Sequence, residues 1–376
     1  MIVYKIFESN ARSSNGRTRD FESRYEGSIP SLATMKLNYR AWILIALGAF
    51  IFALAGFLLG RYFNLHWIQQ SEEVTYDNPP LRSKESRYKF ISPLYACGTL
   101  GHEKFQEFIP LKNKIQKIID DQLYAKAASA ISVYFRDLNR GRRFAINDAE
   151  HYFPASLSKV PMMITYFKLA ESNPQILDET ILYDGSFNAN AKEDIKPKNA
   201  IKPGSYYTVD ELISAMILHS DNNATRLLFN RIEPTLLSEV FSDLNIPAPK
   251  DTKLDVMTVK LYSYFFRVLY NATYLSQLMS DKALKLLTQA DFQSGLRANV
   301  PSDVPIAEKY GESTIYSNES KIYSRELHDC GIIYQKTSPY LLCIMTKGDN
   351  FENLTQVIQN ISKTTYQEVV DASYQN

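Results

Sequence analysis

The chain has 376 residues, of which 45% are hydrophobic and 22% charged, which are ordinary values for a globular protein. Its length allows about two domains, or one large domain with an anchor. The formal net charge of +1 provides neither a basic field for nucleic acid nor an acidic tail, so no nucleic-acid partner is expected. The five histidines and three cysteines lack the spacing of metal ligands, so we expect no metal site and no cofactor.

Residues 1–40 are polar and contain many arginines, and we expect a disordered tail. The next segment, 41–60, reads AWILIALGAFIFALAGFLLG and is uncharged between Arg40 and Arg61. At about 1.5 Å per residue, a helix of this length spans roughly 30 Å, the thickness of a bilayer's hydrocarbon core. We therefore predict a single transmembrane helix. Basic residues outnumber acidic ones before it, so the positive-inside rule puts the N-terminus in the cytoplasm and the remainder outside.

Other interpretations of residues 41–60 stay open. A cleaved signal peptide would end near the ALA sequence at 53–55, but the apolar run continues beyond it, which favours an uncleaved anchor. A buried globular helix would seldom lack any charge over this length. A start at Met35 would give a more ordinary signal-anchor, and the sequence does not decide between Met1 and Met35.

Residues 61–108 contain DNPPLRSKESRYK and no strong periodicity, so they are expected to form an extracytoplasmic stalk. Folded character begins near Ile109, and we predict a globular domain over residues 109–376. Apolar residues at 111, 115, 118, 119 and 123 form a helical stripe. AISVYFRDL and RFAINDAEHYF follow on either side of the turn NRGR and are typical of a β-hairpin.

SLSKVPMMITYFKLAE is then an apolar helix, and residues 178–207 form a long polar excursion. TVDELISAMILHS and NATRLLFNRI are predicted helices on either side of a DN pair, and helices continue to about Leu287. Strands return at PIAEKYGE, ELHDCGIIYQ and YLLCIMTKG, and ENLTQVIQNISKTTYQEVV is a closing helix. This order predicts an α+β fold, in which the late strands join the early hairpin in one antiparallel sheet covered by the terminal helices.

YFPASLSK, residues 152–159, contains a serine and a lysine at S-x-x-K spacing. A serine hydroxyl is a weak nucleophile until a base takes its proton. If Ser156 opens the helix, Lys159 lies one turn on along the same face, and the helix N-terminus lowers the lysine pKa and favours an alkoxide. The alternative is that Ser156 only caps the helix. The spacing is weak support alone, because SRYK at 86–89 has the same form in the stalk.

HSDNNA places Ser220, Asp221 and Asn222 between two amphipathic helices. As a simple helix junction, Ser220 and Asp221 would cap the helix that begins near Asn223. As a functional motif, Ser220 would relay a proton to a leaving nitrogen and Asn222 would bind a substrate amide. Asp221 would then hold the loop through local backbone bonds.

AEKYGE places Lys309 on a predicted strand, shortly before Gly311, whose lack of a side chain lets a substrate backbone approach closely. A lysine on a strand is usually a solvated surface residue. A similar K-x-G occurs in a turn at residues 202–204, so this motif is also weak alone. It becomes informative together with the other two.

Taken in order, the motifs resemble the S-x-x-K, S-D-N and K-[ST]-G marks of the class A β-lactamase family and the wider penicillin-binding group, at similar separations. Flanking text is also similar to the family: VYFRDLNRGRRFAINDAEHYFPAS before the serine, GLRANVPSDVPIAEKYGE around the lysine, and the last two strands. The resemblance covers residues 110–374. It implies a five-stranded antiparallel sheet with helices on both sides, an all-helical lobe, and an active site between them.

The resemblance also implies a role for the motif residues. Ser156 would be the acylated nucleophile, and Lys159 its activating lysine. Ser220 would pass a proton to the departing nitrogen. Lys309 would stabilise developing charge and bind the substrate carboxylate.

Substrate binding is implied for neighbouring residues. Asn222 would contact the acylamide side chain of the substrate. The backbone N–H groups of Ser156 and Glu312 would form the oxyanion hole, so a glutamate side chain at 312 is compatible if only its N–H is used. Tyr310 and Gly311 complete this substrate-binding stretch of the strand.

Departures from the family pattern bear on function. The family carries a glutamate in an E-x-x-L-N loop that positions the water for release of the acyl-enzyme, whereas residues 244–259 contain no glutamate. Asp251 and Asp255 are the only carboxylates there, and solvated loop residues are the favoured interpretation of both. Tyr310 replaces the small hydroxyl residue of the third motif, which changes the group that reads the substrate carboxylate.

Cys330 stands where the family often has an arginine. Nearby His328 could supply a polar group close to Lys309, although a plain strand-end histidine is the favoured interpretation. Cys330 and Cys343 fall nearly opposite each other if QKTSP turns the hairpin. Cross-strand bridges need a particular geometry and buried thiols are common, so free thiols are favoured over a disulfide, which stays open outside the cytoplasm. Cys97 has no evident role.

Three functions follow as alternatives. Our leading prediction, from the three ordered motifs, is a serine hydrolase that opens the amide of a small-molecule β-lactam through a Ser156 acyl-enzyme. A D-alanyl-D-alanine carboxypeptidase or transpeptidase acting on peptidoglycan stem peptides would use the same residues, and it fits the membrane anchor and the missing glutamate. A non-catalytic binding module is disfavoured, since decayed enzymes usually lose such groups first. The oligomeric state is not indicated.

Overall fold

The computed structural model describes residues 48, 81–82, 88–96, 108–247, 257–316 and 322–373. The expected tail, most of the expected transmembrane segment, and the loop carboxylates Asp251 and Asp255 lie outside the described residues. Among the residues that are described, no helix combines the length and apolar character needed to cross a membrane.

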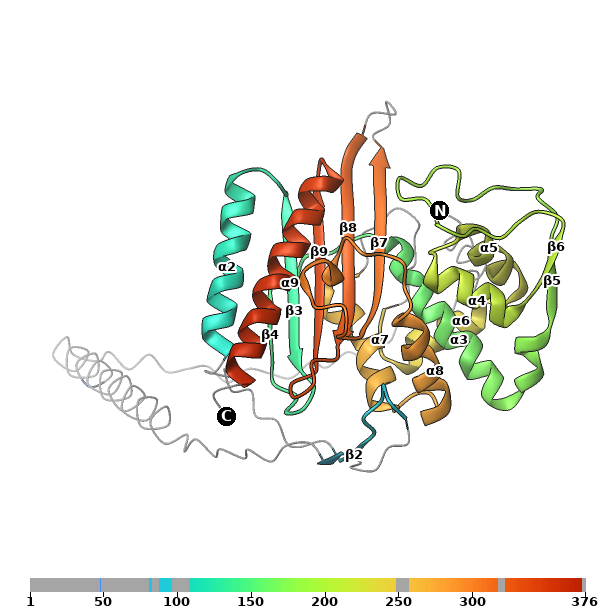
Figure 1. Cartoon of the computed structure of the whole chain (residues 1–376), viewed down its shortest axis with the longest axis horizontal. Helices are drawn as coiled ribbons and strands as arrows, with labels where there is room; N and C mark the ends of the chain where they lie inside the picture. The colour runs from blue at the N-terminus through green and yellow to red at the C-terminus, as the bar shows by residue number, and fades with distance from the viewer. Residues whose placement is uncertain are drawn as a thin grey trace, which may run out of the picture. The chain divides into compact units, whose positions relative to one another are not determined.

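A five-stranded antiparallel sheet forms the centre of the fold (Figure 1). The strand order is β4-β3-β9-β8-β7, so the early hairpin lies beside the late strands, as the sequence predicted. Within the described sheet β7 is an edge strand, and this leaves its outer side to other parts of the chain. The strands are β3 (Ala130–Asp137), β4 (Arg143–Ile146), β7 (Ile306–Tyr316), β8 (Ile322–Ile333) and β9 (Tyr340–Gly348).

Strands β3 and β9 lie inside the sheet and are buried on both faces. Their sequences, AISVYFRD and YLLCIMTKG, are accordingly near-continuous apolar runs rather than alternating ones. One face of the sheet is covered by α2 (Ile109–Tyr124) and α9 (Phe351–Ser373), which lie side by side in Figure 1. Ile115, Val133 and Val357 belong to the core that these helices share with the sheet.

The opposite face packs on α7 (Val259–Asn271) and on a helical lobe. At the centre of this lobe, α3 is buried on nearly all sides, which explains why KVPMMITYFKLAES shows no clear polar face. The helices of the lobe are α3 (Lys159–Ser172), α4 (Val209–Leu218), α5 (Asn222–Arg231), α6 (Pro234–Asp243) and α8 (Gln277–Leu287).

The structure also contains two small sheets that the sequence analysis did not predict. β5 (Thr180–Tyr183) pairs with β6 (Ser205–Thr208) inside the expected polar excursion. β1 (Leu81–Arg82) pairs with β2 (Leu94–Ala96) inside the expected stalk. Strands of two to four residues are too short for an alternating pattern to stand out, so the sequence alone does not reveal them.

The starts of α4 and α5 are fixed by local capping interactions. Thr208 and Glu211 exchange side-chain and backbone hydrogen bonds in a capping box at the start of α4. Asp221 caps α5 by accepting from the N–H of Asn223 at 2.7 Å. Between these helices Ser220 has a φ of +55°, so the chain reverses sharply and carries the S-D-N residues at the tip of a tight junction.

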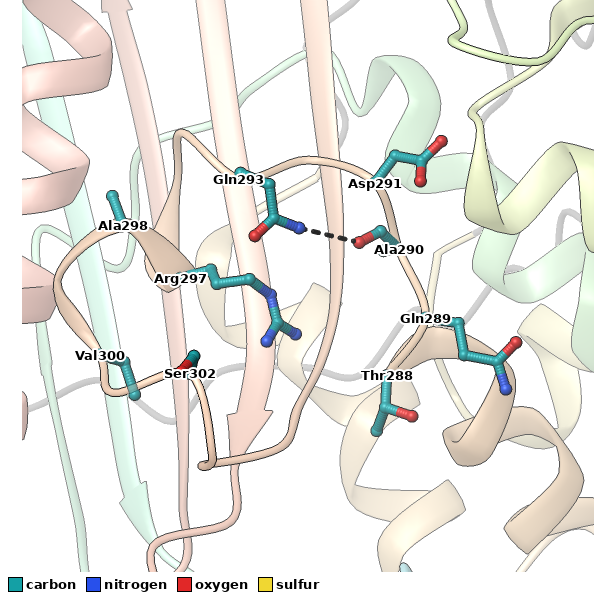
Figure 2. Close-up of a pocket in the computed structure, with 9 residues that line it drawn as sticks. All are labelled: Thr288, Gln289, Ala290, Asp291, Gln293, Arg297, Ala298, Val300 and Ser302. Carbon is teal, nitrogen blue, oxygen red and sulfur yellow. Dashed lines mark hydrogen bonds between the residues drawn. The ribbon is translucent and has the colours of Figure 1, made fainter.

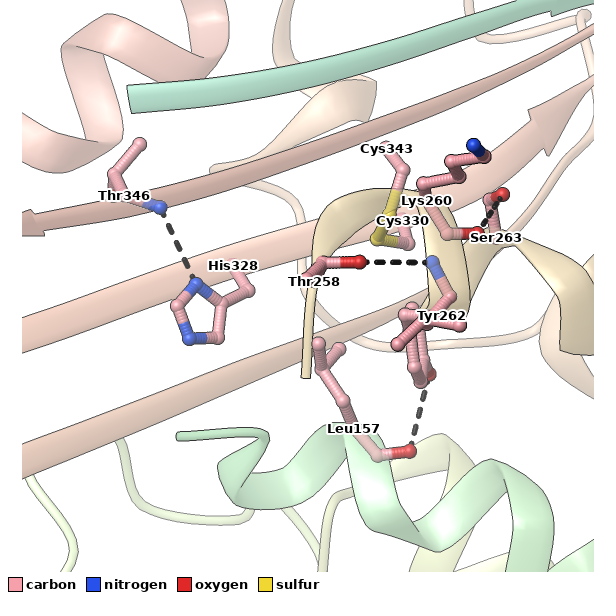
Figure 3. The surroundings of a disulfide bond; sticks show 10 residues. Leu157, Thr258, Lys260, Tyr262, Ser263, His328, Cys330, Cys343 and Thr346 are labelled. Carbon is pink, nitrogen blue, oxygen red and sulfur yellow. Dashed lines mark hydrogen bonds between the residues drawn. A yellow bond between two sulfur atoms is a disulfide. The ribbon is translucent and has the colours of Figure 1, made fainter. Parts of the chain in front are cut away.

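Cys330 of β8 and Cys343 of β9 are paired in register and joined by a disulfide (Figure 3). Their Cα atoms are 4.0 Å apart. The favoured expectation of free thiols is therefore wrong. The hairpin register that the sequence predicted brings both side chains to the same face, where they are fully buried in the core that contains Tyr262.

Candidate active site

Ser156 lies in a short 3₁₀ turn, η2 (Ala155–Ser158), that runs directly into α3. The α-helix begins at Lys159, so Ser156 precedes it instead of opening it. Continuous helical backbone still places the two residues one turn apart. Ala155 has a φ of +48°, a left-handed conformation that costs an alanine about 1 kcal/mol, so contacts around the turn must hold it.

Contacts from two other elements fix the chain on either side of Ser156. Glu326 of β8 accepts a hydrogen bond from the N–H of Phe153 at 2.9 Å. The hydroxyl of Tyr262 on α7 donates to the Leu157 carbonyl at 3.1 Å, as Figure 3 shows. The turn that carries Ser156 is therefore anchored to both the sheet and a helix of the opposite layer.

His328 is fully buried in β8, opposite Gly311 of β7, and is not a strand-end residue. The N–H of Thr346 donates to its Nδ1 (Figure 3), so Nε2 carries the ring proton and donates to the Phe153 carbonyl at 3.0 Å. None of the described contacts joins His328 to Lys309. Its hydrogen bonds position the segment before Ser156, and it does not replace the family arginine.

The three sequence motifs meet at the hydroxyl of Ser220. Lys159 Nζ donates to Ser220 Oγ at 2.9 Å and to the Ser220 carbonyl at 2.7 Å. Lys309 Nζ donates to the same Oγ at 3.1 Å and to the Tyr310 carbonyl at 2.9 Å. Both lysines are buried. The fold thus brings together Lys159, Ser220 and Lys309 from three distant parts of the chain, with Ser156 one turn from Lys159.

Burial changes the protonation of both lysines. Desolvation lowers the pKa of Lys159 to about 7, and the carboxylates of Glu193 and Asp221 offset only part of this effect. Desolvation also holds the pKa of Lys309 well below its usual value, and the nearby Lys159 adds to this lowering. A lysine with a pKa near 7 is partly neutral at physiological pH, so Lys159 is able to accept a proton.

Asp221 is fully buried and organises the loop behind Ser220. The sequence predicted local backbone bonds, and its Oδ1 does accept from the N–H of Asn223. It also reaches further, because it accepts from the Asn190 amide at 2.8 Å and from the N–H of Ile201 at 2.7 Å. Asn222, the first residue of α5, is half-buried, and its N–H donates to Asn190 Oδ1 at 2.7 Å.

Gly311 of β7 lies against the turn that carries Ser156. A Cβ added at this position would be 3.0 Å from the Leu157 nitrogen and from the Pro154 carbonyl oxygen. The sequence analysis expected that the lack of a side chain at Gly311 lets a substrate approach. In the structure, the turn that carries Ser156 occupies this space instead. The glycine therefore sets how closely Ser156 lies to β7.

The ring of Tyr310 stacks on Phe292, with ring centroids 4.1 Å apart. Lys309 Nζ lies 4.2 Å from the centroid of the Tyr310 ring, a distance suited to a cation–π contact. Tyr310 thus forms an aromatic wall beside Lys309, in place of the small hydroxyl that the family has there.

The side chain of Glu312 is also part of this region, which the sequence did not reveal. It is 7% exposed, and its Oε1 accepts from the N–H of Ile195 at 2.6 Å. Its Oε2 is buried and has no hydrogen-bond partner. Burial raises the pKa of Glu312 to about 7, although the hydrogen bond from Ile195 opposes the shift. A glutamate on a strand is normally solvated, so only the tertiary contact with Ile195 distinguishes this one.

One pocket borders these residues, and another adjoins that pocket, with Asp291 and Gln293 in both linings. The first, of about 560 Å³, is bordered by Tyr310, Ile195, His219 and Phe292 among others, so it extends from the site through Tyr310. The second, of about 430 Å³, lies in the loops after α8 and contains no residue of the motifs. Its lining is drawn in Figure 2: Thr288, Gln289, Ala290, Asp291, Gln293, Arg297, Ala298, Val300 and Ser302.

Solved structures with the same fold were found by comparison. PBP-A shares 21% sequence identity, with a TM-score of 0.58 over 70% of this chain and 97% of that one. A PBP-A variant in an acyl-enzyme complex with penicillin G shares 19%, with a TM-score of 0.57 over 70% and 97%. A class A β-lactamase from Mycobacterium abscessus shares 18%, with a TM-score of 0.57 over 68% and 98%. These likenesses show a fold common to β-lactamases and penicillin-binding proteins.

Sequence comparison identifies the family. No curated protein matches the chain significantly. A family model described as the Beta-lactamase enzyme family matches residues 110–369, which is more than half of the chain and includes all three motifs. The chain belongs to the Beta-lactamase enzyme family.

Proposed function

We propose that the protein is a serine hydrolase that opens the amide of a β-lactam through an acyl-enzyme on Ser156. The observation that carries the proposal is the convergence of Lys159 and Lys309 on the Ser220 hydroxyl, one turn from Ser156. This arrangement gives a serine nucleophile a buried, partly neutral lysine and a hydroxyl that connects it to a second lysine.

In the proposed reaction, neutral Lys159 takes the proton of Ser156 as its oxygen attacks the lactam carbonyl carbon. The carbonyl oxygen becomes an oxyanion, which the N–H groups of Ser156 and Glu312 stabilise. When the C–N bond breaks, Ser220 gives its proton to the leaving nitrogen, and the proton on Lys159 replaces it through the 2.9 Å hydrogen bond. Ser156 then carries the acyl group.

The substrate is held by groups on both sides of the serine. Lys309 and Tyr310 bind the carboxylate of the substrate, and the negative charge of that carboxylate favours the charged form of Lys309. Asn222, at the start of α5, contacts the acylamide group. Tyr310 replaces the small hydroxyl residue of related enzymes with a phenol whose ring stacks on Phe292, and Lys309 supplies the charge for the carboxylate.

A cell-wall D-alanyl-D-alanine carboxypeptidase or transpeptidase is the second candidate. It would use the same residues on a peptidoglycan stem peptide. The observation that favours it is the absence of a glutamate from residues 244–259, the part of the sequence where related β-lactamases place the group that activates water. Without that group, the acyl-enzyme formed with a β-lactam would be long-lived.

We also propose that the catalytic domain lies outside the cytoplasm, anchored by residues 41–60. The uncharged sequence of that segment supports an anchor. The Cys330–Cys343 disulfide supports an oxidising compartment, because cytosolic proteins seldom keep such bonds. Fractionation of cells and protease protection of the intact chain would test this placement.

Mass spectrometry of the full chain with benzylpenicillin tests the proposed function. We expect one penicillin adduct, on Ser156, and none on the Ser156→Ala variant. An adduct that disappears over minutes favours the β-lactamase, whereas one that persists for hours favours the peptidase. An unmodified wild-type protein, or an adduct retained in Ser156→Ala, would contradict acylation of this serine.

Replacing Gly311 by alanine is expected to destabilise the protein by about 1–3 kcal/mol, because main-chain atoms at 3.0 Å leave no room for the new methyl group. The displaced turn should also slow formation of the adduct on Ser156. Urea unfolding measures the first effect and mass spectrometry the second.

Gly348→Ala is the matched control, because its Cβ would lie 3.0 Å from the Leu354 side chain, away from the motif residues. Both variants should lose stability, but the folded Gly348→Ala protein should acylate at the wild-type rate. Equal acylation rates in the two variants would mean that Gly311 does not set the position of Ser156.

A further inference from the structure

The segment of residues 188–196, here called the strap, is tied at one end to the start of α5. The N–H of Ala189 donates to Asn223 Oδ1 at 2.6 Å. Asn190 bonds the N–H of Asn222 and the carboxylate of Asp221, at 2.7 and 2.8 Å. One end of the strap is therefore fixed to the same loop that carries Ser220.

The other end of the strap is tied to β7. The N–H of Ile195 donates to Glu312 Oε1 at 2.6 Å, and Thr314 Oγ1 donates to Asp194 Oδ2 at 2.8 Å. Figure 1 shows the long connection between β5 and β6 reaching toward β7. The strap thus bridges the two sides of the site, from the S-D-N loop to the strand that carries Lys309.

Carboxylates gather where the strap meets β7. Glu193 and Asp194 on the strap raise the pKa of Glu312, and Glu193 also raises the pKa of Lys159. No described salt bridge neutralises Glu312, although Lys159 and Lys309 both interact with it electrostatically. The nearby Lys196 is engaged elsewhere, because its Nζ donates to the carbonyls of Asn190 and Ala191.

Glu312 contributes a polar atom that lacks a partner. Its side chain is more than nine-tenths buried, Oε1 is held beneath the strap by Ile195, and Oε2 has no hydrogen bond among the described groups. A buried carboxylate oxygen left unpaired is costly, so such an atom is usually completed by a ligand or water. A cation fits its charge.

The position of Glu312 relates this oxygen to the reaction. In the proposed mechanism its backbone N–H binds the oxyanion, so its own carboxylate lies on the order of 5 Å away, the length of its side chain. In the same mechanism Asn222 contacts the acylamide group of the substrate, and its N–H is bonded to Asn190 of the strap, so the acyl side chain would extend toward the strap.

We propose that Glu312 and the strap carboxylates form a subsite for an ammonium group on the acyl side chain, so that the preferred substrates are amides with a cationic side chain. The inference rests on the proposed function, because it assumes that Ser156 is acylated. A bound ammonium would also keep Glu312 ionised, since an opposite charge nearby lowers a carboxyl pKa.

The test uses three penicillins with linear side chains of equal length that end in an ammonium, a methyl or a carboxylate group. Acylation rates of Ser156 are measured on the full chain at pH 8, where Glu312 is ionised. We expect the ammonium compound to react about tenfold faster than the methyl compound, and the carboxylate compound about tenfold slower.

Variants assign the preference to its source. In Glu312→Gln, which keeps an acceptor for Ile195, both rate ratios should fall toward one, and Glu193→Gln should reduce them in part. Glu239→Gln, on the exposed surface of α6, should keep the wild-type ratios. Ratios are compared within each protein, so a general loss of activity does not affect them.

The outcomes separate the inference from the proposed function. If wild-type protein is acylated equally by all three compounds, the subsite is wrong and the acylation mechanism stands. A preference that survives in both Glu312→Gln and Glu193→Gln also overturns the subsite. If none of the three compounds acylates Ser156, the proposed function fails, and the subsite fails with it.

Discussion

Replacing Lys159 by methionine is expected to slow acylation of Ser156 by benzylpenicillin by about a thousandfold. Positioned general bases contribute a factor of about 10²–10⁴ to enzyme rates. Lys159 is the lysine closest in sequence to Ser156 and also bonds Ser220, so its loss removes both the proton acceptor and the donor that recharges Ser220. Methionine fills a similar volume, so the protein should remain folded.

The pH profile separates this role from a structural one. Lys159 must be neutral to accept a proton, and its pKa is lowered to about 7 by burial. The wild-type acylation rate should therefore rise as the pH increases through about 7 and level off above it. In Lys159→Met the rise should be absent.

Lys168→Met serves as the control, because Lys168 lies on the exposed side of the same helix. It should keep both the rate and the pH profile of the wild type. A rise through pH 7 that persists in Lys159→Met would transfer the role of base to Lys309, whose pKa burial also lowers.

The main sheet could be predicted because its strands are long and carry strong local patterns. The strands around Lys309, Cys330 and Cys343 were each predicted, the last of them as an apolar run, and the QKTSP turn gave the register that pairs the two cysteines. The same argument fails for β5 and β6, which are four residues long and separated by a polar connection. Their pairing depends on tertiary packing that no local pattern encodes.

The candidate site could be predicted where catalytic residues occur at a characteristic spacing in the sequence. Ser156 and Lys159 are joined by helix geometry, and the family motifs supply Ser220 and Lys309. The sequence could not show that both lysines converge on one hydroxyl, because that depends on contacts between residues more than 60 positions apart.

Other parts of the site depend on burial, which sequence alone does not report. Glu312 was expected to act only through its N–H, and His328 to lie at a strand end. Tertiary contacts with Ile195 and Phe153 instead bury both side chains and give them specific partners. A polar residue on a strand gives the same sequence signal whether it faces water or a neighbouring loop.

A buried charged cluster behind Lys309 carries the second large expected effect. Arg297 lies in a short 3₁₀ helix after α8, η4 (Leu296–Asn299). Its Nε is 3.3 Å from the Glu308 carboxylate, and its Nη2 donates to the Ile306 carbonyl at 2.8 Å. Asp329 is fully buried beside them and accepts from the N–H of Leu296 at 2.8 Å. The carboxyl groups of Glu308 and Asp329 each have one buried oxygen without a hydrogen bond. Their described cationic neighbours are Arg297 and Lys309.

Replacing Arg297 by methionine is expected to lower the free energy of unfolding by about 3 kcal/mol at pH 8, because removal of one partner leaves buried charge uncompensated. At pH 5 the cost should fall to about 1 kcal/mol, the value of the lost hydrogen bond to Ile306. Urea unfolding at the two pH values measures the difference. Arg143→Met, on the exposed edge strand β4, should change little at either pH.

The sign of this pH dependence follows from the carboxyl groups. Burial raises the pKa of Asp329 to about 7 and that of Glu308 well above its usual value, so the folded state binds more protons than the unfolded state between pH 4 and pH 7. Ionisation of these groups therefore costs stability as the pH rises, and Arg297 offsets that cost only when they are charged. An equal loss of stability at pH 5 and pH 8 would show that Arg297 acts through packing instead of charge. Asp329 and Glu308 also favour the charged form of Lys309. Protonation of these two carboxyl groups therefore affects both the stability of the fold around Arg297 and the charge of Lys309.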